Sequence, residues 1–431
     1  MSGTSRRLRA IFGGSVGNLV EWYDWYAYSA FSLYFARAFF PPANQTIQLL
    51  NAAAVFAVGF FMRPLGGWLM GRYADRHGRR AALTASVLLM CGGSLLIAVT
   101  PTYASIGLAA PALLVLARLL QGLSVGGEYG ASATYLSEMA GQRHRGFWSS
   151  FQYVTLIMGQ LLALGVLLVL QRVLDDEALR AWGWRIPFVI GALCAVVAIW
   201  LRRSLEESAE FEAVRSARAS RAASAPPLAS LRALAAHPRA VFTVVGLTAG
   251  GTVAFYTFTT YAQKYLVNTA GFTAQQATLI NAVTLGGYML LQPLVGALSD
   301  VVGRRPVLMA FGVVGTLGTV PLFRALEQVR TVPSAVGLLM LALVAVSGYT
   351  AINAVVKAEL FPTGVRALGV GFPYAVTVSL FGGTAEYVAL WCKSIGHESW
   401  FYWYVTGCIA LSLVVYATMR ESSKSGLMAA D

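Results

Sequence analysis

Long apolar runs separated by short charged segments dominate this chain of 431 residues. A helix needs about 20 apolar residues to cross the hydrocarbon core of a bilayer. Backbone N–H and C=O groups in lipid must bond within their own segment, so spans of this kind form helices. The pattern therefore predicts an all-α membrane protein with twelve transmembrane helices. The runs lie near residues 10–36, 47–71, 81–100, 106–138, 147–171, 184–201, 239–266, 275–298, 306–324, 334–358, 367–392 and 399–419.

The charge content argues against most soluble classes of protein. Only 12% of the residues are charged, against about 25% in ordinary soluble domains. The net charge of +13 is spread in short bursts between apolar runs, so we expect no nucleic-acid partner. The four cysteines form no CxxC pair, and no GxxxxGK[ST] sequence occurs. We therefore expect neither an enzyme, nor a metal site, nor a cofactor.

The basic residues predict how the chain is oriented and divided. Most of the 32 Lys and Arg residues fall in alternate loops, on the side that holds both chain ends. The positive-inside rule places that side in the cytoplasm. The stretch 202–238 mixes charged residues with Ala, Ser and Pro, which is typical of a linker. We expect a six-helix bundle in residues 1–201, a cytoplasmic linker in 202–238, and a second bundle in 239–431.

Two short patterns of the first half return in the same order in the second half. One follows the second run, in GRYADRHGRR, and returns 225 residues later; the other follows the fourth run and returns 221 residues later. Two matched pairs in one order indicate a duplicated six-helix unit. The matched positions are Asp75 with Asp300, Arg79 with Arg304, Glu138 with Glu359, and Arg145 with Arg366.

The first run carries a polar stripe that includes two carboxylates. Asn18, Glu21, Asp24 and Tyr28 are spaced by 3, 3 and 4 residues, so they share one face of a helix. A carboxylate inside the membrane must pair, take up a proton, or face water. Burial and neighbouring negative charge favour the protonated form, which a proton carrier requires. Permanently ion-paired structural carboxylates are the alternative. Glu128, in the fourth run, is a third candidate.

Two arginines also lie within predicted spans. Arg63 has no carboxylate neighbour in its own run, and its planar guanidinium suits a bound carboxylate; extension to the membrane surface is the alternative. By analogy with related membrane proteins, Arg118 is the expected partner of Asp24. Glu386 pairs with either Lys264 or Lys393, and the sequence leaves its role open. Polar groups of other runs suit a small polar solute or contact neighbouring helices; the candidates are Gln152, Tyr153, Tyr256 and Lys264.

Small residues mark one face of the fourth run. Gly122, Gly126 and Gly130 recur every four residues. Glycine lets helix backbones approach closely in a membrane. The spacing therefore predicts a close contact between this helix and a neighbour.

Several of these segments resemble one family of transporters. GRYADRHGRR resembles the signature loop of the major facilitator superfamily. GNLVEWYDWYAYS, FMRPLGGWLMGRYADRHGRR and RLLQGLSVGGEYGASATYLSE resemble the metabolite:proton symporters of bacterial inner membranes. The resemblance implies two pseudo-symmetric six-helix bundles that work by alternating access. It also implies import of a five-carbon dicarboxylate, alpha-ketoglutarate, with protons as the coupling ion. The alternative is another small solute: citrate or another dicarboxylate, shikimate, or proline/betaine.

The resemblance and the residues together give a set of expected roles. We expect a monomer that crosses the inner membrane many times, with both chain ends in the cytoplasm. Asp24 is the expected proton site, with Glu21 or Glu128 as alternatives. The expected substrate residues are Arg63, Arg118, Gln152, Tyr153, Tyr256 and Lys264. The expected gate residues are Asp75, His77, Arg79, Arg145, Asp300, Arg304, Glu359 and Arg366.

Overall fold

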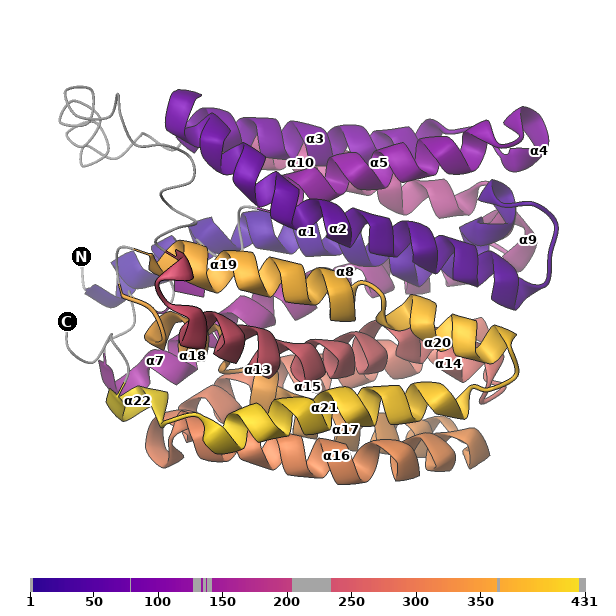
Figure 1. Ribbon diagram of the computed structural model, residues 1–431. Coiled ribbons are helices and arrows are strands. Elements are labelled where there is room, and N and C mark those ends of the chain that lie inside the picture. The colour runs from indigo at the N-terminus through magenta and orange to yellow at the C-terminus, as the bar shows by residue number, and fades with distance from the viewer. Residues whose placement is uncertain are drawn as a thin grey trace.

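The computed structural model describes residues 3–77, 79–126, 133–134, 137, 142–203, 234–362 and 365–425. Every secondary-structure element assigned in these ranges is a helix, which confirms the all-α prediction (Figure 1). The predicted linker lies largely outside the described residues, so its expected boundaries remain a prediction.

The helices form the twelve membrane-crossing segments expected from the sequence. Eight segments of the described ranges are long and apolar enough to cross a membrane, and α1 with three shorter apolar helices completes the set. In chain order the segments are α1 (Gly3–Phe39), α2 (Gln45–His77), α3 (Arg79–Val99), α5 (Ala109–Val125), α7 (Arg145–Ser149) with α8 (Phe151–Val173), α10 (Ile186–Arg203), α13 (Pro238–Tyr256) with α14 (Ala262–Asn268), α15 (Ala274–Val302), α16 (Arg304–Gln328), α17 (Val332–Thr350) with α18 (Asn353–Glu359), α19 (Arg366–Thr377) with α20 (Ala385–Ser394), and α21 (Ser399–Thr418).

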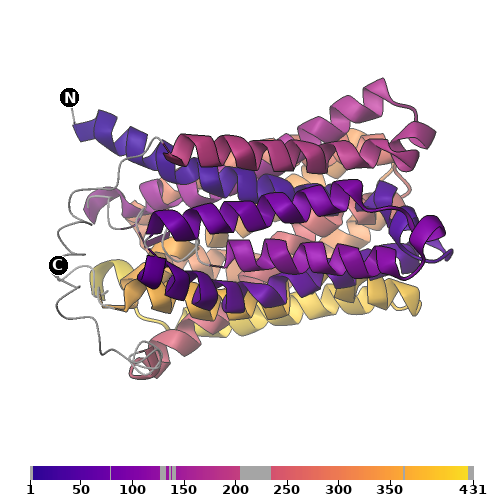
Figure 2. The same ribbon diagram turned by 90° about the horizontal axis from the view of Figure 1, so that it is seen from above.

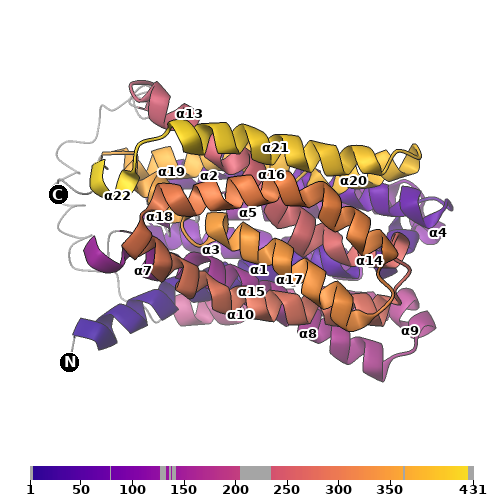
Figure 3. The ribbon, with the colours of Figure 1, turned by 90° about the horizontal axis from the view of Figure 1, so that it is seen from below.

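The long helices run along one common direction, as Figures 2 and 3 show from above and below. The start of α1, α7 and the short helix α22 (Ser422–Ser425) lie at one end, which we call the linker end. The short helices α4 (Tyr103–Ile106) and α9 (Asp176–Ala181) lie at the other end, the far end (Figure 1). The bundle therefore has two opposite ends, formed by different connecting segments.

Helices of the first and second halves of the chain meet along the centre of the molecule. α7 and α8 pack against α15, and α2 packs against α19 and α20. Two of the segments in the second half are interrupted by π-helical turns, at Thr257–Tyr261 and at Val378–Gly382. Turns of this type occur frequently at functional sites, because they redirect side chains within a helix. The first turn is fully buried, the second is buried at Val378, Ser379 and Gly382, and both contact helices of the first half.

Helix ends are set by residues suited to them. Thr273 accepts a hydrogen bond from the Gln276 amide at 3.2 Å, and the Gln276 side chain accepts one from the Thr273 amide at 3.1 Å. This capping box satisfies two N–H groups at the start of α15. Gly303 ends the same helix with φ at 99°, a conformation that favours glycine. That requirement explains the glycine in the repeated loop pattern of the second half.

Glycines of α5 allow it to lie directly on α2, as the sequence predicted. A Cβ atom at Gly122 would lie 2.1 Å from the carbonyl oxygen of Gly59, and one at Gly126 would lie 2.0 Å from that of Arg63. Gly130 lies outside the described residues. The contact fixes the height of Arg63 relative to the side chains of α5.

We predict that Gly122→Ala destabilises the protein, because the added methyl group forces α2 and α5 apart. The expected loss is about 1–3 kcal/mol in the free energy of unfolding, seen as a lower Tm of the purified protein in detergent. Gly92→Ala is the matched control: it lies in α3 of the same half, and its Cβ meets nothing within 4 Å. An equal Tm for the two variants would contradict the close packing.

Candidate functional site

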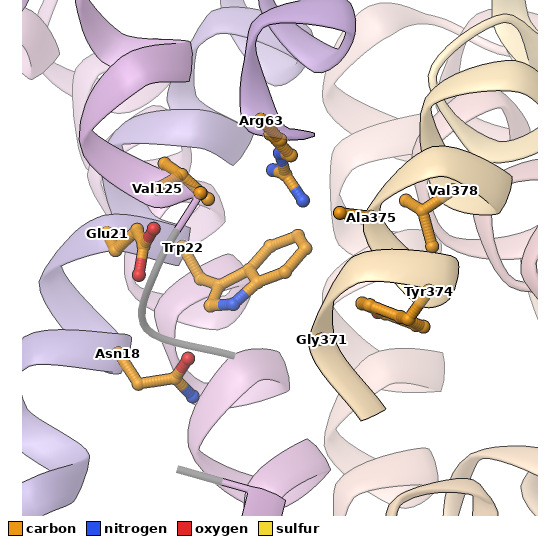
Figure 4. A pocket seen from close by; sticks show the side chains of 10 residues that line it. Asn18, Glu21, Trp22, Arg63, Val125, Gly371, Tyr374, Ala375 and Val378 are labelled. Carbon is orange, nitrogen blue, oxygen red and sulfur yellow. The ribbon is translucent and has the colours of Figure 1, made fainter. Parts of the chain in front are cut away.

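A small pocket lies between the two halves of the chain (Figure 4). Its volume is about 20 Å³, room for about one water molecule. An organic acid does not fit, so the halves must separate before a solute enters. The lining residues come from α1, α2 and α5 on one side and from the second half on the other: Asn18, Glu21, Trp22, Arg63, Val125, Gly126, Gly371, Tyr374, Ala375 and Val378.

Arg63 is the cation of this pocket. It is 5% exposed, and its Cζ atom lies 4.1 Å from the ring centre of Phe60, 4.3 Å from that of Trp25 and 5.2 Å from that of Trp22. Its Nε and Nη2 groups have no hydrogen-bond acceptor among the described residues. Figure 4 shows the guanidinium directed into the space between the halves. The side chain is therefore buried, surrounded by aromatic rings, and has N–H groups to spare for a further acceptor.

Arg118 lies deeper in the first half. It is completely buried on α5, with its Cζ atom 3.9 Å from the ring centre of Trp25 and 4.5 Å from that of Tyr28. Its Nη1 group donates to Gln121 Oε1 at 2.8 Å, while Nε and Nη2 lack an acceptor in the described part of the chain. Arg118 does not line the pocket. The two buried guanidiniums thus contact the same indole, that of Trp25.

Asp24 and Arg118 are connected through an amide. The Asp24 side chain is 1% exposed and accepts hydrogen bonds from Ser94 and, at 2.5 Å, from Gln121 Nε2. The same Gln121 accepts from Arg118 through its oxygen. The sequence predicted a direct pair, but the ion pairs of the described residues do not include Asp24 with Arg118. Gln121, a donor and an acceptor at once, separates the two charges and links them.

Of the two alternative proton sites, Glu21 and Glu128, the structure describes only Glu21. Glu21 lines the pocket with Arg63 and is 5% exposed (Figure 4). Asn18, one turn earlier on α1, donates to Thr155 at 2.8 Å and so joins α1 to α8. The polar stripe predicted on this helix therefore faces the interior at these positions. Glu128 lies outside the described residues.

Three of the predicted substrate residues, Gln152, Tyr153 and Tyr256, do not line the pocket. Gln152 and Tyr153 are buried on α8, and the Tyr153 ring contacts Phe255 with centres 5.5 Å apart. The Tyr256 ring lies edge-on to Phe60, with centres 5.3 Å apart, and its hydroxyl group is an electrostatic neighbour of Arg63. These groups become accessible only if the central helices move.

The sequence reading missed Tyr374, which lines the pocket opposite Arg63. It follows Tyr153 by 221 residues, the offset already seen between Arg145 and Arg366, so the internal repeat identifies it. Lys357 is completely buried behind it, with Nζ 3.8 Å from the Tyr374 ring centre. The offset of the internal repeat could have identified Tyr374 from the sequence. No sequence pattern indicated its contact with Lys357.

Lys264, on α14 of the second half of the chain, lies toward the far end of the bundle and forms an ion pair. Its Nζ atom lies 3.2 Å from Glu386 Oε2 and also donates to Ser29 Oγ. Ser29 in turn donates to Glu386 Oε2 at 3.1 Å. Lys393 pairs instead with Glu398, at 3.0 Å. Of the two partners left open for Glu386, the structure selects Lys264.

At the linker end, Asp300 joins the two halves. Its carboxylate accepts hydrogen bonds from the backbone N–H groups of Gly146 at 2.8 Å and Phe147 at 3.0 Å, at the start of the segment formed by α7 and α8. Arg304 pairs with the same carboxylate at 2.8 Å and reaches Glu359 at 3.7 Å. Three predicted gate positions of the second half thus form one cluster, and the bonds from Gly146 and Phe147 connect that cluster to the first half.

Of the remaining predicted gate residues, Arg145 and Arg366 belong to the described part of the structure. The side chains of Asp75, His77 and Arg79 do not. Arg145 is an electrostatic neighbour of Glu359. Arg366 donates to the backbone oxygen of Phe361 at 3.1 Å, within the second half. The backbones of Asp75 and His77 end α2 and that of Arg79 begins α3, while their side chains lie outside the described part.

Glu421 supports the linker-end cluster from outside the membrane-spanning segments. Burial opposes its ionisation, but hydrogen bonds from the backbone N–H groups of Arg304 at 2.8 Å and Arg305 at 2.9 Å outweigh it and lower the pKa of this carboxyl. The charged carboxylate thus caps the start of α16, where a helix end favours negative charge. The bond from the Arg304 backbone to Glu421 helps to position the Arg304 side chain for its ion pair with Asp300.

Comparisons with known proteins agree with this architecture. A family model described as sugar (and other) transporter matches residues 10–226 and 212–431. The alpha-ketoglutarate permease of Escherichia coli (strain K12) is 56% identical over 423 residues, which cover 98% of this chain and 96% of that protein. A citrate-proton symporter of Klebsiella pneumoniae is 34% identical over 380 residues, covering 88% of this chain and 83% of that protein.

The fold is also similar to solved structures. The partially occluded inward-open xylose transporter XylE from E. coli superposes with a TM-score of 0.74 at 18% identity, covering 95% of this chain and 97% of that one. This likeness confirms the predicted major facilitator fold, and the curated relatives confirm a transporter in place of an enzyme. The chain belongs to the sugar (and other) transporter family of the major facilitator superfamily.

Proposed function

We propose that this protein imports alpha-ketoglutarate together with protons across the bacterial inner membrane. The observation that carries the proposal is Arg63, a buried guanidinium with two acceptor-free N–H groups in a pocket between the halves. Identity of 56% to an alpha-ketoglutarate permease over nearly the whole chain supports the substrate. The transporter works as a monomer, with bundles in residues 1–201 and 239–431, a cytoplasmic linker in 202–238, and the linker end facing the cytoplasm.

Binding begins with the carboxylates of the substrate. A planar guanidinium binds a carboxylate through two parallel hydrogen bonds, and its aromatic surroundings keep water away. Arg63 takes one carboxylate, and Tyr256, Gln152 and Tyr153 supply polar groups around it. Lys264, in the other half, receives the second carboxylate as the halves close.

Asp24 carries the coupled proton. A proton on Asp24 removes the negative charge that holds Gln121, and Gln121 then releases Arg118. Without the Asp24 charge, the positive charge of Arg118, already beside Trp25, is no longer offset by a nearby carboxylate, and this strengthens binding of the dianion at Arg63. Proton and substrate therefore favour each other's binding, and linkage makes this effect reciprocal. Glu21, which lines the pocket, and Glu128 are the alternative proton sites.

Alternating access follows from the contacts at the two ends. At the linker end, the cluster of Asp300 and Arg304 holds α15 against the start of the segment formed by α7 and α8. Opening toward the cytoplasm breaks these bonds, and opening outward keeps them. The gate at this end is completed by Arg145, Glu359, Arg366, Asp75, His77 and Arg79.

The substrate assignment is tested by uptake of labelled alpha-ketoglutarate into proteoliposomes under an imposed pH gradient. We expect saturable accumulation that collapses when a protonophore removes the gradient. Empty liposomes are the control. If citrate, shikimate or proline/betaine drives the only saturable flux, the substrate is wrong while transport by this family stands.

Arg63→Gln should weaken binding of alpha-ketoglutarate about tenfold or more, because it removes a charge-assisted hydrogen-bond pair. Arg63→Lys should not restore full affinity, since an ammonium cannot bond both carboxylate oxygens in the same way. Arg72→Gln is the control on the same helix; this side chain lies 5.1 Å from the Trp68 ring centre, outside the pocket. Isothermal titration of the purified proteins measures the difference, and equal affinities would contradict the role.

Asp24→Asn should abolish accumulation driven by a pH gradient yet keep exchange of labelled for unlabelled substrate. The amide cannot carry a proton, but it preserves the size of the side chain and its bond with Ser94. Asp176→Asn is the control, because that carboxylate is exposed and pairs with Arg180 on α9. Normal accumulation by the Asp24 variant would remove it from the coupling mechanism.

A further inference from the structure

Three residues from three helices form a buried charged cluster in the far-end half of the molecule. Ser29 comes from α1, Lys264 from α14 and Glu386 from α20. The side chains of Lys264 and Glu386 are 0% and 5% exposed. The cluster therefore joins the first half of the chain to the second through one hydroxyl group that bonds both charges.

Stability alone does not account for this ion pair. Moving two charges from water into a protein interior costs several kcal/mol for each ion, which their attraction often fails to offset. An ionisable pair within a membrane-spanning region is instead a mark of function. The Lys264 ammonium has three N–H donors, and the described residues accept only two of them. A further oxygen atom can bind there.

We infer that Ser29, Lys264 and Glu386 form an outer gate in which Glu386 takes the place of a substrate carboxylate on Lys264. This inference rests on the proposed transport of a dicarboxylate. In the closed, empty protein the Glu386 carboxylate neutralises Lys264, and Ser29 completes the bonding from the opposite half. When the far end opens, Ser29 moves away with α1, while Lys264 and Glu386 remain together on the second half.

An incoming carboxylate then replaces Ser29 on Lys264 and competes with Glu386 for it. Both anions bind the same ammonium, so the negative charge of Glu386 opposes substrate binding. No other cation among the described residues lies within ion-pair distance of Glu386. In the described part of the chain, Glu386 is also an electrostatic neighbour of three hydroxyl groups, those of Tyr26, Tyr28 and Tyr261. Competition for Lys264 is therefore the main electrostatic effect of this carboxylate.

The test measures binding of alpha-ketoglutarate to purified protein by isothermal titration, beside 2-oxopentanoate, which has the same chain length and one carboxylate. We expect Glu386→Gln to bind the dicarboxylate about fivefold more tightly or better. Lys264→Gln should bind it about tenfold more weakly and lose the preference for two carboxylates over one. The double variant should behave like Lys264→Gln alone, because Glu386 acts through Lys264.

Glu398→Gln is the matched control, since Glu398 forms an ion pair with Lys393 at 3.0 Å in the same half but at the edge of the bundle. We expect unchanged affinity for both ligands. Unchanged affinity of Glu386→Gln, or a double variant that gains affinity over Lys264→Gln, overturns the inference. If Glu386→Gln does not fold, Ser29→Ala replaces it: this variant removes one acceptor of Lys264, so affinity must rise if the gate competes with substrate.

Failure of the proposed function gives a different result. If the unaltered protein does not bind alpha-ketoglutarate, that assignment fails, and the same variants are titrated with citrate. The competition predicts the same order of affinities for any dicarboxylate or tricarboxylate. If Glu386→Gln and the unaltered protein bind citrate with equal affinity, the proposed gate is overturned for citrate as well.

Discussion

The cost of placing charge in a low-dielectric interior governs how this protein is built. Each buried ion must be held by groups that replace water. In the first half, aromatic rings surround Arg63 and Arg118, and Gln121 spans the gap between Arg118 and Asp24. Aromatic faces stabilise a guanidinium without neutralising it. Both arginines therefore keep the positive charge that an anionic solute requires.

Close helix packing is what brings these groups together. Glycines on α5 let its backbone touch that of α2, and Gly191 of α10 leaves room for Asp24, whose Oδ1 atom a Cβ there would approach to 2.7 Å. Larger side chains at these glycine positions would clash with the neighbouring backbone or side chain and force the helices apart. The placement of the charges thus depends on residues that carry no charge themselves.

The sequence predicted the helices, the internal repeat and the buried charges, because each depends on local spacing along one segment. It did not predict the partners of those charges. Asp24 and Gln121 are 97 residues apart, and Ser29 and Glu386 are 357 residues apart, so no periodicity connects them. Gln121 stands one turn from Arg118 on α5, and this spacing alone does not identify Asp24 as its other partner. Only the packing of α1 against α5 makes it a bridge.

The buried cations of the two halves differ in whether a carboxylate already neutralises them. Arg63, in the first half, has donors without acceptors, whereas Lys264, in the second half, is already neutralised by Glu386. A carrier that imports its substrate must return empty, and an unpaired ammonium in the closed far end would oppose that return. A carboxylate built into the second half removes the obstacle. In the proposed gate the same carboxylate yields when a substrate arrives, so the strength of the Lys264–Glu386 pair is a compromise between fast return and tight binding.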